Sequence, residues 1–113
     1  MRRGDVYLAD LGTARGSEQS GRRPVLVFED NRLLRVTLTV VVIPFTTSLR
    51  LGKLPTCTLV PAGEGGLRQD SVAVCHQMRG LDKSAFLERW GTLPDDRTRE
   101  VERTVLRTLG VKQ

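Results

Sequence analysis

The chain has few aromatic residues, one histidine, two isolated cysteines and no long apolar run. Aromatic residues make up only 4% of its 113 residues, so binding of single strands by stacking bases on aromatic rings has few platforms. His76 is the only histidine, which excludes a pair of histidines sharing acid and base catalysis within one chain. No apolar run approaches the ~20 residues that span a bilayer, which argues against a membrane segment.

Cys57 and Cys75 stand alone, without a CxxC pair or a histidine at metal-ligand spacing. Both fall in strand-like segments, where a free cysteine behaves as a small hydrophobe. The sequence therefore predicts no metal site and no cofactor. The N-terminus, MRRGDVYLAD, is basic but lacks an apolar signal region, so we expect a cytoplasmic protein.

The chain carries an excess of positive charge, with a formal net charge of +5 and a pI of about 10.0. Most of the excess lies in residues 1–56, which hold nine Lys/Arg and five Asp/Glu. Such a balance favours nucleic acid or an acidic protein as partner, or it serves solubility alone. A chain of this length forms one domain, residues 1–113. It buries roughly two-thirds of its surface on folding and so needs no disulfide bond or bound metal to stabilise its core.

Short strands dominate the predicted secondary structure. Apolar alternation and β-branched runs predict them over Asp5–Asp10, Pro24–Phe28, Thr37–Phe45, Thr56–Val60 and Asp70–Cys75, the last continuing through Arg79. The run 37–45 predicts a central strand whose regular pairing ends at Pro44. A short helical turn is predicted over Lys83–Arg89, and a helix over Asp95–Leu109 with its apolar stripe at Val101, Val105, Leu106 and Leu109. This order predicts a mainly β fold with α, a small bent antiparallel barrel, SH3-like or OB-like.

A polar loop, Leu11–Arg22, runs into two arginines, a proline and an aliphatic strand. At this length the loop is long for a compact domain, and such loops tend to be functional. Arg23 is suited to a phosphodiester, where its guanidinium stabilises developing negative charge; alternatively it holds the loop through Glu18 or Asp30. Glu18 is a candidate base for a ribose 2′-hydroxyl, or it caps the loop.

Hydroxyl and amide groups supply the remaining candidates. Thr46 and Thr47 follow the predicted central strand, where they donate to a phosphate oxygen or satisfy local turn groups. His76 can serve as a base or a stacking contact, and Gln77 offers donors and an acceptor to a base edge.

Four ordered blocks give the chain a resemblance to the MazF/PemK (Kid-like) toxins of bacterial toxin–antitoxin systems. The blocks are RRGDVYLADL (2–11), GSEQSGRRPVLV (16–27), PFTTSLRLGKLP (44–55) and DSVAVCHQMRGLDKS (70–84), followed by the terminal helix. The resemblance covers the chain from end to end.

The resemblance implies an SH3-like barrel of the CcdB/PemK type that acts as a homodimer. It also implies a metal-independent endoribonuclease that cuts single-stranded RNA, chiefly mRNA, at short motifs by 2′-hydroxyl attack. The family's catalytic arginine and threonine fall on Arg23 and Thr46. The positions that line its RNA groove match Ser17, Glu18, Gln19, His76 and Gln77. The implied partner is a cognate antitoxin whose acidic tail blocks that groove.

Two points stay open at this stage. Because a guanidinium keeps its proton in proteins, we expect Arg23 to stabilise the phosphorane electrostatically, which leaves the base among Glu18, His76 and water. Two other functions also fit the fold, a CcdB-like gyrase-binding toxin and a barrel that binds RNA without cutting it. The GSEQ–RRP loop and the Thr46–Thr47 pair favour the nuclease, since gyrase binding would not require them.

Overall fold

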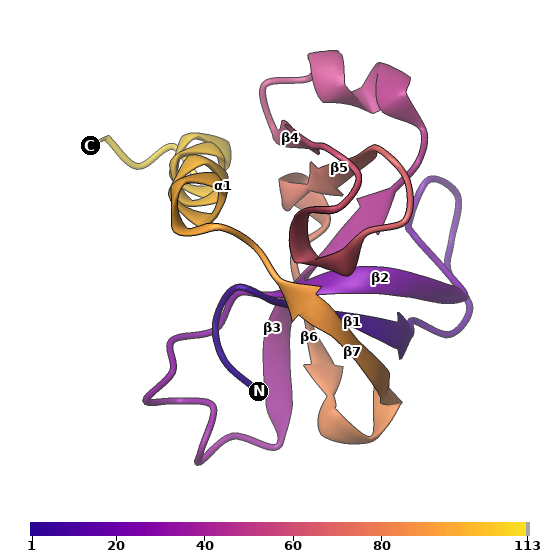
Figure 1. Ribbon diagram of the computed structural model, residues 1–113, viewed down its shortest axis with the longest axis vertical. Coiled ribbons are helices and arrows are strands. Elements are labelled where there is room, and N and C mark those ends of the chain that lie inside the picture. The colour runs from indigo at the N-terminus through magenta and orange to yellow at the C-terminus, as the bar shows by residue number, and fades with distance from the viewer. Residues whose placement is uncertain (113) are drawn as a thin grey trace.

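A computed structural model describes residues 1–112 and consists mainly of short strands (Figure 1). The strands are β1 (Asp5–Asp10), β2 (Arg22–Val27), β3 (Thr39–Thr46), β4 (Cys57–Val60), β5 (Ser71–Val74), β6 (Arg79–Asp82) and β7 (Phe86–Thr92). One-turn 3₁₀ segments fall at Leu49–Lys53 (η1), Glu64–Gly66 (η2), Cys75–Gln77 (η3) and Lys83–Ala85 (η4). The helix α1 (Asp95–Thr108) follows them, within a residue of its predicted end.

The strands form one antiparallel sheet in the order β4-β5-β3-β2-β1-β7, with β6 also paired to β3. Strand β3 is central, as predicted: β2 lies along one side of it, and β6 and then β5 lie along the other. The prediction that Pro44 ends regular pairing is wrong, because Pro44 pairs with Val25 inside β3. The pairing with β6 ends at Val42 and that with β5 begins at Phe45, so the proline lies where the strand changes partner.

Alternation along β2 and β3 builds two apolar clusters on opposite faces of these strands. Leu26, Ile43 and Phe45 face one cluster, which α1 completes with Val101 and Val105. The other face carries the second cluster, to which β1, β2, β3 and β6 contribute Ala9, Val25, Val27, Val40, Val42 and Leu81, and to which Leu11, just after β1, also belongs. Both faces of β3 are thus buried, which explains its nearly continuous apolar sequence.

Helix α1 lies to one side of the sheet, beside β4 and β5 (Figure 1). Its predicted stripe is partly right: Val101 and Val105 are buried, Leu106 is half-buried, and Leu109 is 59% exposed beyond the helix end. A buried hydrogen bond from Thr58 Oγ1 of β4 to Thr104 Oγ1, 2.8 Å long, ties the helix to the sheet. Among residues 1–112, no helix is long and apolar enough to cross a membrane.

Two predicted elements between residues 75 and 92 are corrected by the structure. The strand from Asp70 does not run through Arg79, because η3 interrupts it after Val74. The helical turn over Lys83–Arg89 is only the short η4, and β7 follows it and pairs with β1. Strand β7 was not predicted from the sequence because its register with β1 shifts twice. Each shift breaks the alternation of inward and outward side chains on which the prediction of a strand depends.

Candidate functional site

The two residues predicted to be catalytic lie on neighbouring strands. Strands β2 and β3 pair from Val27↔Val42 to Val25↔Pro44, and Arg23 and Thr46 each lie two residues past that last pair, where Thr46 pairs with Val72 of β5. Because side chains alternate, Arg23 shares a face with Val25, and Thr46 shares a face with Pro44. Both residues therefore fall on the face that carries the second apolar cluster, near the ends of strands that are anchored in the core by residues such as Val25 and Val42.

The guanidinium of Arg23 retains most of its hydrogen-bonding capacity. Its Nε donates to Ser20 O at 2.8 Å, which ties the end of the loop to the strand. Within residues 1–112 its two Nη atoms have no protein acceptor, and the alternative pairing with Glu18 or Asp30 is not made. Asp30 instead binds Arg32 through both oxygens. Arg23 thus presents a half-buried fork of N–H donors, which suits a phosphate group.

Thr46 is buried, with 7% of its surface exposed, and its Oγ1 accepts from Ser48 N at 3.2 Å. This is the local turn bond that the sequence left as an alternative. The bond uses one lone pair and leaves the hydroxyl proton without a protein acceptor in residues 1–112, so turn formation and donation to a phosphate oxygen are compatible. Thr47 beside it is exposed.

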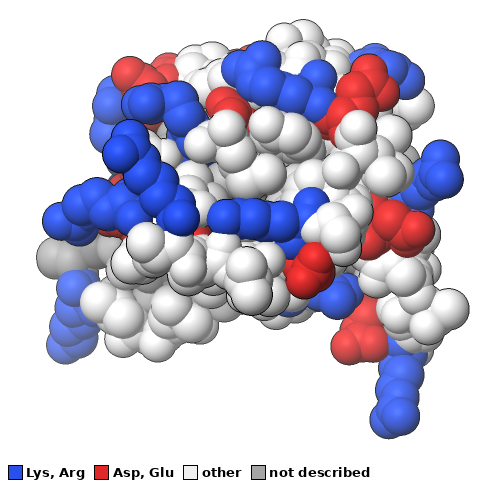
Figure 2. Space-filling view, turned by 90° about the horizontal axis from the view of Figure 1, so that it is seen from below, with Lys and Arg blue, Asp and Glu red and all other residues white. Residues whose placement is uncertain are grey.

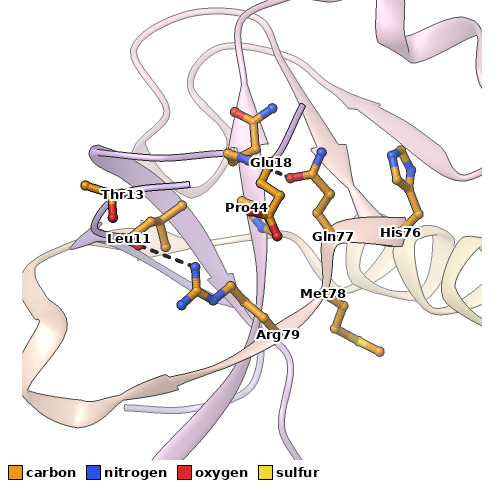
Figure 3. Close-up of a pocket in the computed structure, with 9 residues that line it drawn as sticks. Leu11, Thr13, Glu18, Pro44, His76, Gln77, Met78 and Arg79 are labelled. Carbon is orange, nitrogen blue, oxygen red and sulfur yellow. Dashed lines mark hydrogen bonds between the residues drawn. The ribbon is translucent and has the colours of Figure 1, made fainter. Parts of the chain in front are cut away.

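A pocket of about 460 Å³ lies between the β1–β2 loop and the segment around η3 (Figure 3). Four predicted site residues line it, namely Glu18, Gln19, His76 and Gln77, whereas Arg23, Thr46, Ser17 and Thr47 do not. Five lining residues were not predicted: Leu11, Thr13, Pro44, Met78 and Arg79. Since Pro44 belongs to the same face of β3 as Thr46, the pocket borders the end of the sheet where Arg23 and Thr46 lie.

Arg79 is the missed residue with the clearest chemical potential. It opens β6, and its Nη1 lies 3.4 Å from Leu11 O, so the side chain reaches across the pocket (Figure 3). It supplies a second guanidinium near the site. The sequence does show a charged side chain two positions after Gln77. It was missed because a continuous strand was predicted through residue 79, in which that residue is only one more position of the inward–outward alternation.

His76 lies at the far end of the pocket from Leu11 and Thr13 (Figure 3). It is exposed, and its Nδ1 is 2.7 Å from Thr56 Oγ1, which orients the imidazole ring. One ring nitrogen is therefore engaged by the protein while the ring stays open to solvent. This arrangement is compatible with base chemistry or with a contact to a bound nucleotide.

The two cysteines are unsuited to nucleophilic chemistry. Both are buried and unpaired. Burial raises the pKa of the Cys75 thiol to about 12 and also raises the pKa of Cys57. Neither thiol therefore supplies a thiolate near neutral pH. Within residues 1–112, no three His, Cys, Asp or Glu side chains lie close enough together to hold a metal ion.

On the face of the molecule in Figure 2, basic side chains are not gathered in one block. On the face shown in Figure 2, Lys and Arg side chains outnumber Asp and Glu but lie interspersed with them. With a net charge of +5, the field of the protein favours an anionic partner at long range. Recognition then depends on local groups such as those around the pocket.

The structure defines a small, mainly β protein in which an antiparallel sheet is completed by one C-terminal helix. The family model described as PemK-like, MazF-like toxin of type II toxin–antitoxin system matches residues 2–109. The chain belongs to this family. This confirms the predicted family and the predicted fold class.

Individual relatives agree along nearly the whole chain. Endoribonuclease MazF of Staphylococcus saprophyticus is 38% identical over 111 residues, which cover 98% of this chain and 92% of the relative. The crystal structure of MazF from Deinococcus radiodurans has a TM-score of 0.83 and 27% identity, covering 98% of this chain and 97% of its own. A structure of MazE–MazF from the same organism gives a TM-score of 0.78 at 26% identity, covering 99% and 97%.

Proposed function

We propose that this chain is a metal-independent toxin endoribonuclease that cuts single-stranded RNA, chiefly mRNA, at short motifs and thereby stops translation. The class of activity rests on the family match over residues 2–109 and on the 38% identity to an endoribonuclease MazF. The cleavage chemistry and the substrate are supported by the site itself.

The observation that supports the chemistry is that Arg23 and Thr46 lie just beyond the paired segment of β2 and β3, each two residues past the pair Val25↔Pro44. In the proposed reaction the ribose O2′ bonds to the adjacent phosphorus and the bond from phosphorus to O5′ breaks. The 2′-hydroxyl proton passes to a base, and the departing O5′ takes up a proton. The products are a 2′,3′-cyclic phosphate and a 5′-hydroxyl.

Arg23 and Thr46 have complementary tasks in this scheme. The Nη donors of Arg23 meet the charge that builds on the non-bridging oxygens of the phosphorane, where preorganised donors act most strongly. The Thr46 hydroxyl holds one phosphate oxygen in line. Neither residue needs to exchange a proton, which agrees with a guanidinium that stays charged.

The base is either Glu18, His76 or water. Glu18 Oε1 accepts from Arg15 N at 2.6 Å, which holds the carboxylate within the loop, and its side chain lines the pocket. Ser17, Gln19, Thr47 and His76 are the proposed direct contacts to RNA, and Gln77 belongs to the same site through the loop residues that it hydrogen-bonds. Of these, Gln19 and His76 line the pocket together with Glu18.

We further propose that the toxin acts as a homodimer in the cytoplasm and is neutralised by a cognate antitoxin with an acidic tail. The solved MazE–MazF structure of a relative supports a partner of this kind. The net charge of +5 suits an acidic tail as well as RNA, so both should associate fast and in a salt-sensitive way.

The test is cleavage of a long single-stranded RNA in excess EDTA, with both ends of each product mapped. Discrete products with 2′,3′-cyclic phosphate ends are expected. Arg23→Ala should lower the rate about 10²–10³-fold, as loss of a transition-state donor does. Arg22→Ala is the matched control, because it removes the same charge from the exposed, opposite face of β2 and should change the rate little.

Three results would contradict the proposal. Equal effects of the two arginine substitutions would show that only overall charge matters. Binding of RNA without cleavage would favour the RNA-binding barrel. Absence of both RNA binding and RNA cleavage, in folded protein free of antitoxin, would favour a gyrase-binding toxin.

A further inference from the structure

Both polar atoms of the Gln77 side chain are engaged by the β1–β2 loop. Gln19 N donates to Gln77 Oε1 at 2.7 Å, and Gln77 Nε2 donates to Ser17 O at 3.0 Å. The two loop groups, Ser17 O and Gln19 N, are a carbonyl and an N–H two residues apart, the same pair of groups that a strand offers to its neighbour. The carboxamide of Gln77 binds them in the place of a neighbouring strand. The orientation of the amide is determined, since exchanging its oxygen and nitrogen would lose both bonds.

Gln77 extends from a rigid base. It ends the 3₁₀ turn η3, whose first residue, Cys75, is 2% exposed and donates its N–H to Thr56 O at 3.0 Å. On the other side, Met78 N donates to Cys75 O at 3.2 Å, and the Met78 side chain packs on the main apolar cluster. The backbone on both sides of Gln77 is thus fixed by the core.

The loop, by contrast, has little to hold it. Its ends are closed by hydrogen bonds from Leu11 N to Gly21 O and from Gly21 N to Gly12 O, both 2.9 Å long. Between these ends, residues 12–18 are all exposed, and Gly12 and Gly16 adopt φ values of 72° and 54°. Within residues 1–112, the two bonds of Gln77 are the hydrogen bonds that join residues 17–19 to another element.

We propose that Gln77 is a positioning residue, a latch that fastens Ser17–Gln19 over the pocket and so presents Glu18 and Gln19 to the RNA. The latch itself follows from the contacts of the free chain, whereas its effect on RNA rests on the proposed function. In this state the amide of Gln77 is not available to a base edge. Its role is to order the loop before RNA arrives, instead of reading sequence directly.

Amide hydrogen exchange of the RNA-free protein tests the latch without any assay of activity. In Gln77→Ala, the exchange rate at Gln19 N should rise roughly 5- to 100-fold, the range expected from losing one or two hydrogen bonds. Gln77→Glu keeps the acceptor for Gln19 N but loses the donor to Ser17 O. The exchange rate at Gln19 N in this variant should therefore lie between those of the unmodified protein and of Gln77→Ala. His76→Ala is the control for this measurement, since it alters the same turn without touching the loop. An unchanged rate at Gln19 in Gln77→Ala overturns the proposal.

Steady-state kinetics on RNAs with several cleaved sites test the consequence. Without the latch, RNA must order the loop as it binds, so KM should rise by a similar factor at every site while kcat and the cleaved motif stay the same. If Gln77→Ala accepts other bases at one position of the cleaved RNA motif while the exchange rate at Gln19 N is unchanged, Gln77 reads the RNA sequence and the latch is refuted. If the unmodified protein cuts no RNA, the proposed function fails, and the exchange experiment still decides the latch.

Discussion

The hydroxyl pair that joins α1 to β4 allows a sharp test of how the helix is held. Thr58 and Thr104 are each 3% exposed, and Thr58 Oγ1 donates to Thr104 Oγ1 at 2.8 Å. Thr104 Oγ1 in turn donates to Glu100 O at 3.1 Å, one turn back along the helix. The two side chains thus form a short buried chain of hydrogen bonds between elements 46 positions apart in sequence.

Valine replaces threonine at nearly constant shape, so each substitution removes a hydroxyl without opening a cavity. Thr58→Val removes a donor and should lower the free energy of unfolding by about 1 kcal/mol. Thr104→Val leaves the Thr58 O–H without its acceptor in the interior, which should cost about 2 kcal/mol. In the double variant no hydroxyl is stranded, so we expect a loss of about 1 kcal/mol instead of the sum.

Urea unfolding of the four proteins gives the coupling free energy, here about 2 kcal/mol. All samples should share one protein concentration, because unfolding of the proposed homodimer would depend on concentration. Thermal melts should show the same order, at about 4 °C per kcal/mol for a chain of this size. Losses that add within about 0.5 kcal/mol would refute the reasoning, because independent sites add to that degree. The helix would then be held by its other contacts, such as the buried Val101 and Val105 and the ion pair of Arg97 with Glu64.

Two further predictions concern other parts of the fold. Gly66→Ala should destabilise by several kcal/mol, because its φ is +74° and an added Cβ would overlap the carbonyl oxygen of Trp90. Gly63→Ala, at φ +94° with open space around it, should cost only about 1 kcal/mol in the same urea titration, and equal losses would contradict the packing argument. Hydrogen bonds from Arg32 lower the pKa of the Asp30 carboxyl from 3.8 to about 2, so its stabilising contribution is complete above pH 4 and is lost as pH falls towards 2. An NMR titration should place the midpoint near pH 2 and move it part of the way back towards 3.8 in Arg32→Ala, because the backbone N–H of residue 32 still donates to the carboxylate in that variant; an unchanged midpoint would show that the Arg32 side chain is not the cause.

The sequence was sufficient for the features that depend on local patterns. Alternation and β-branched residues located β1 to its exact ends, because a half-buried strand repeats every two residues. The run Thr37–Phe45 indicated the central strand, since only a strand buried on both faces needs so many apolar residues in succession. Acidic residues at 95 and 96 and a glycine at 110 bounded α1 within about a residue.

The remaining features of the fold and of the site were decided by the tertiary structure, because these features depend on which distant segments of the chain meet. Strand β7 could not be read locally, since its register shifts erase the alternation, and only its pairing with β1 defines it. Arg23 and Thr46 were proposed from their chemistry and the family resemblance, but only the pairing of β2 with β3 brings the two strand ends that carry them together. No local pattern in CHQMR shows that the amide of Gln77 meets a backbone 58 residues earlier. Sequence fixes the conformation of neighbours along the chain, whereas a contact between remote residues exists only once the core has closed around them.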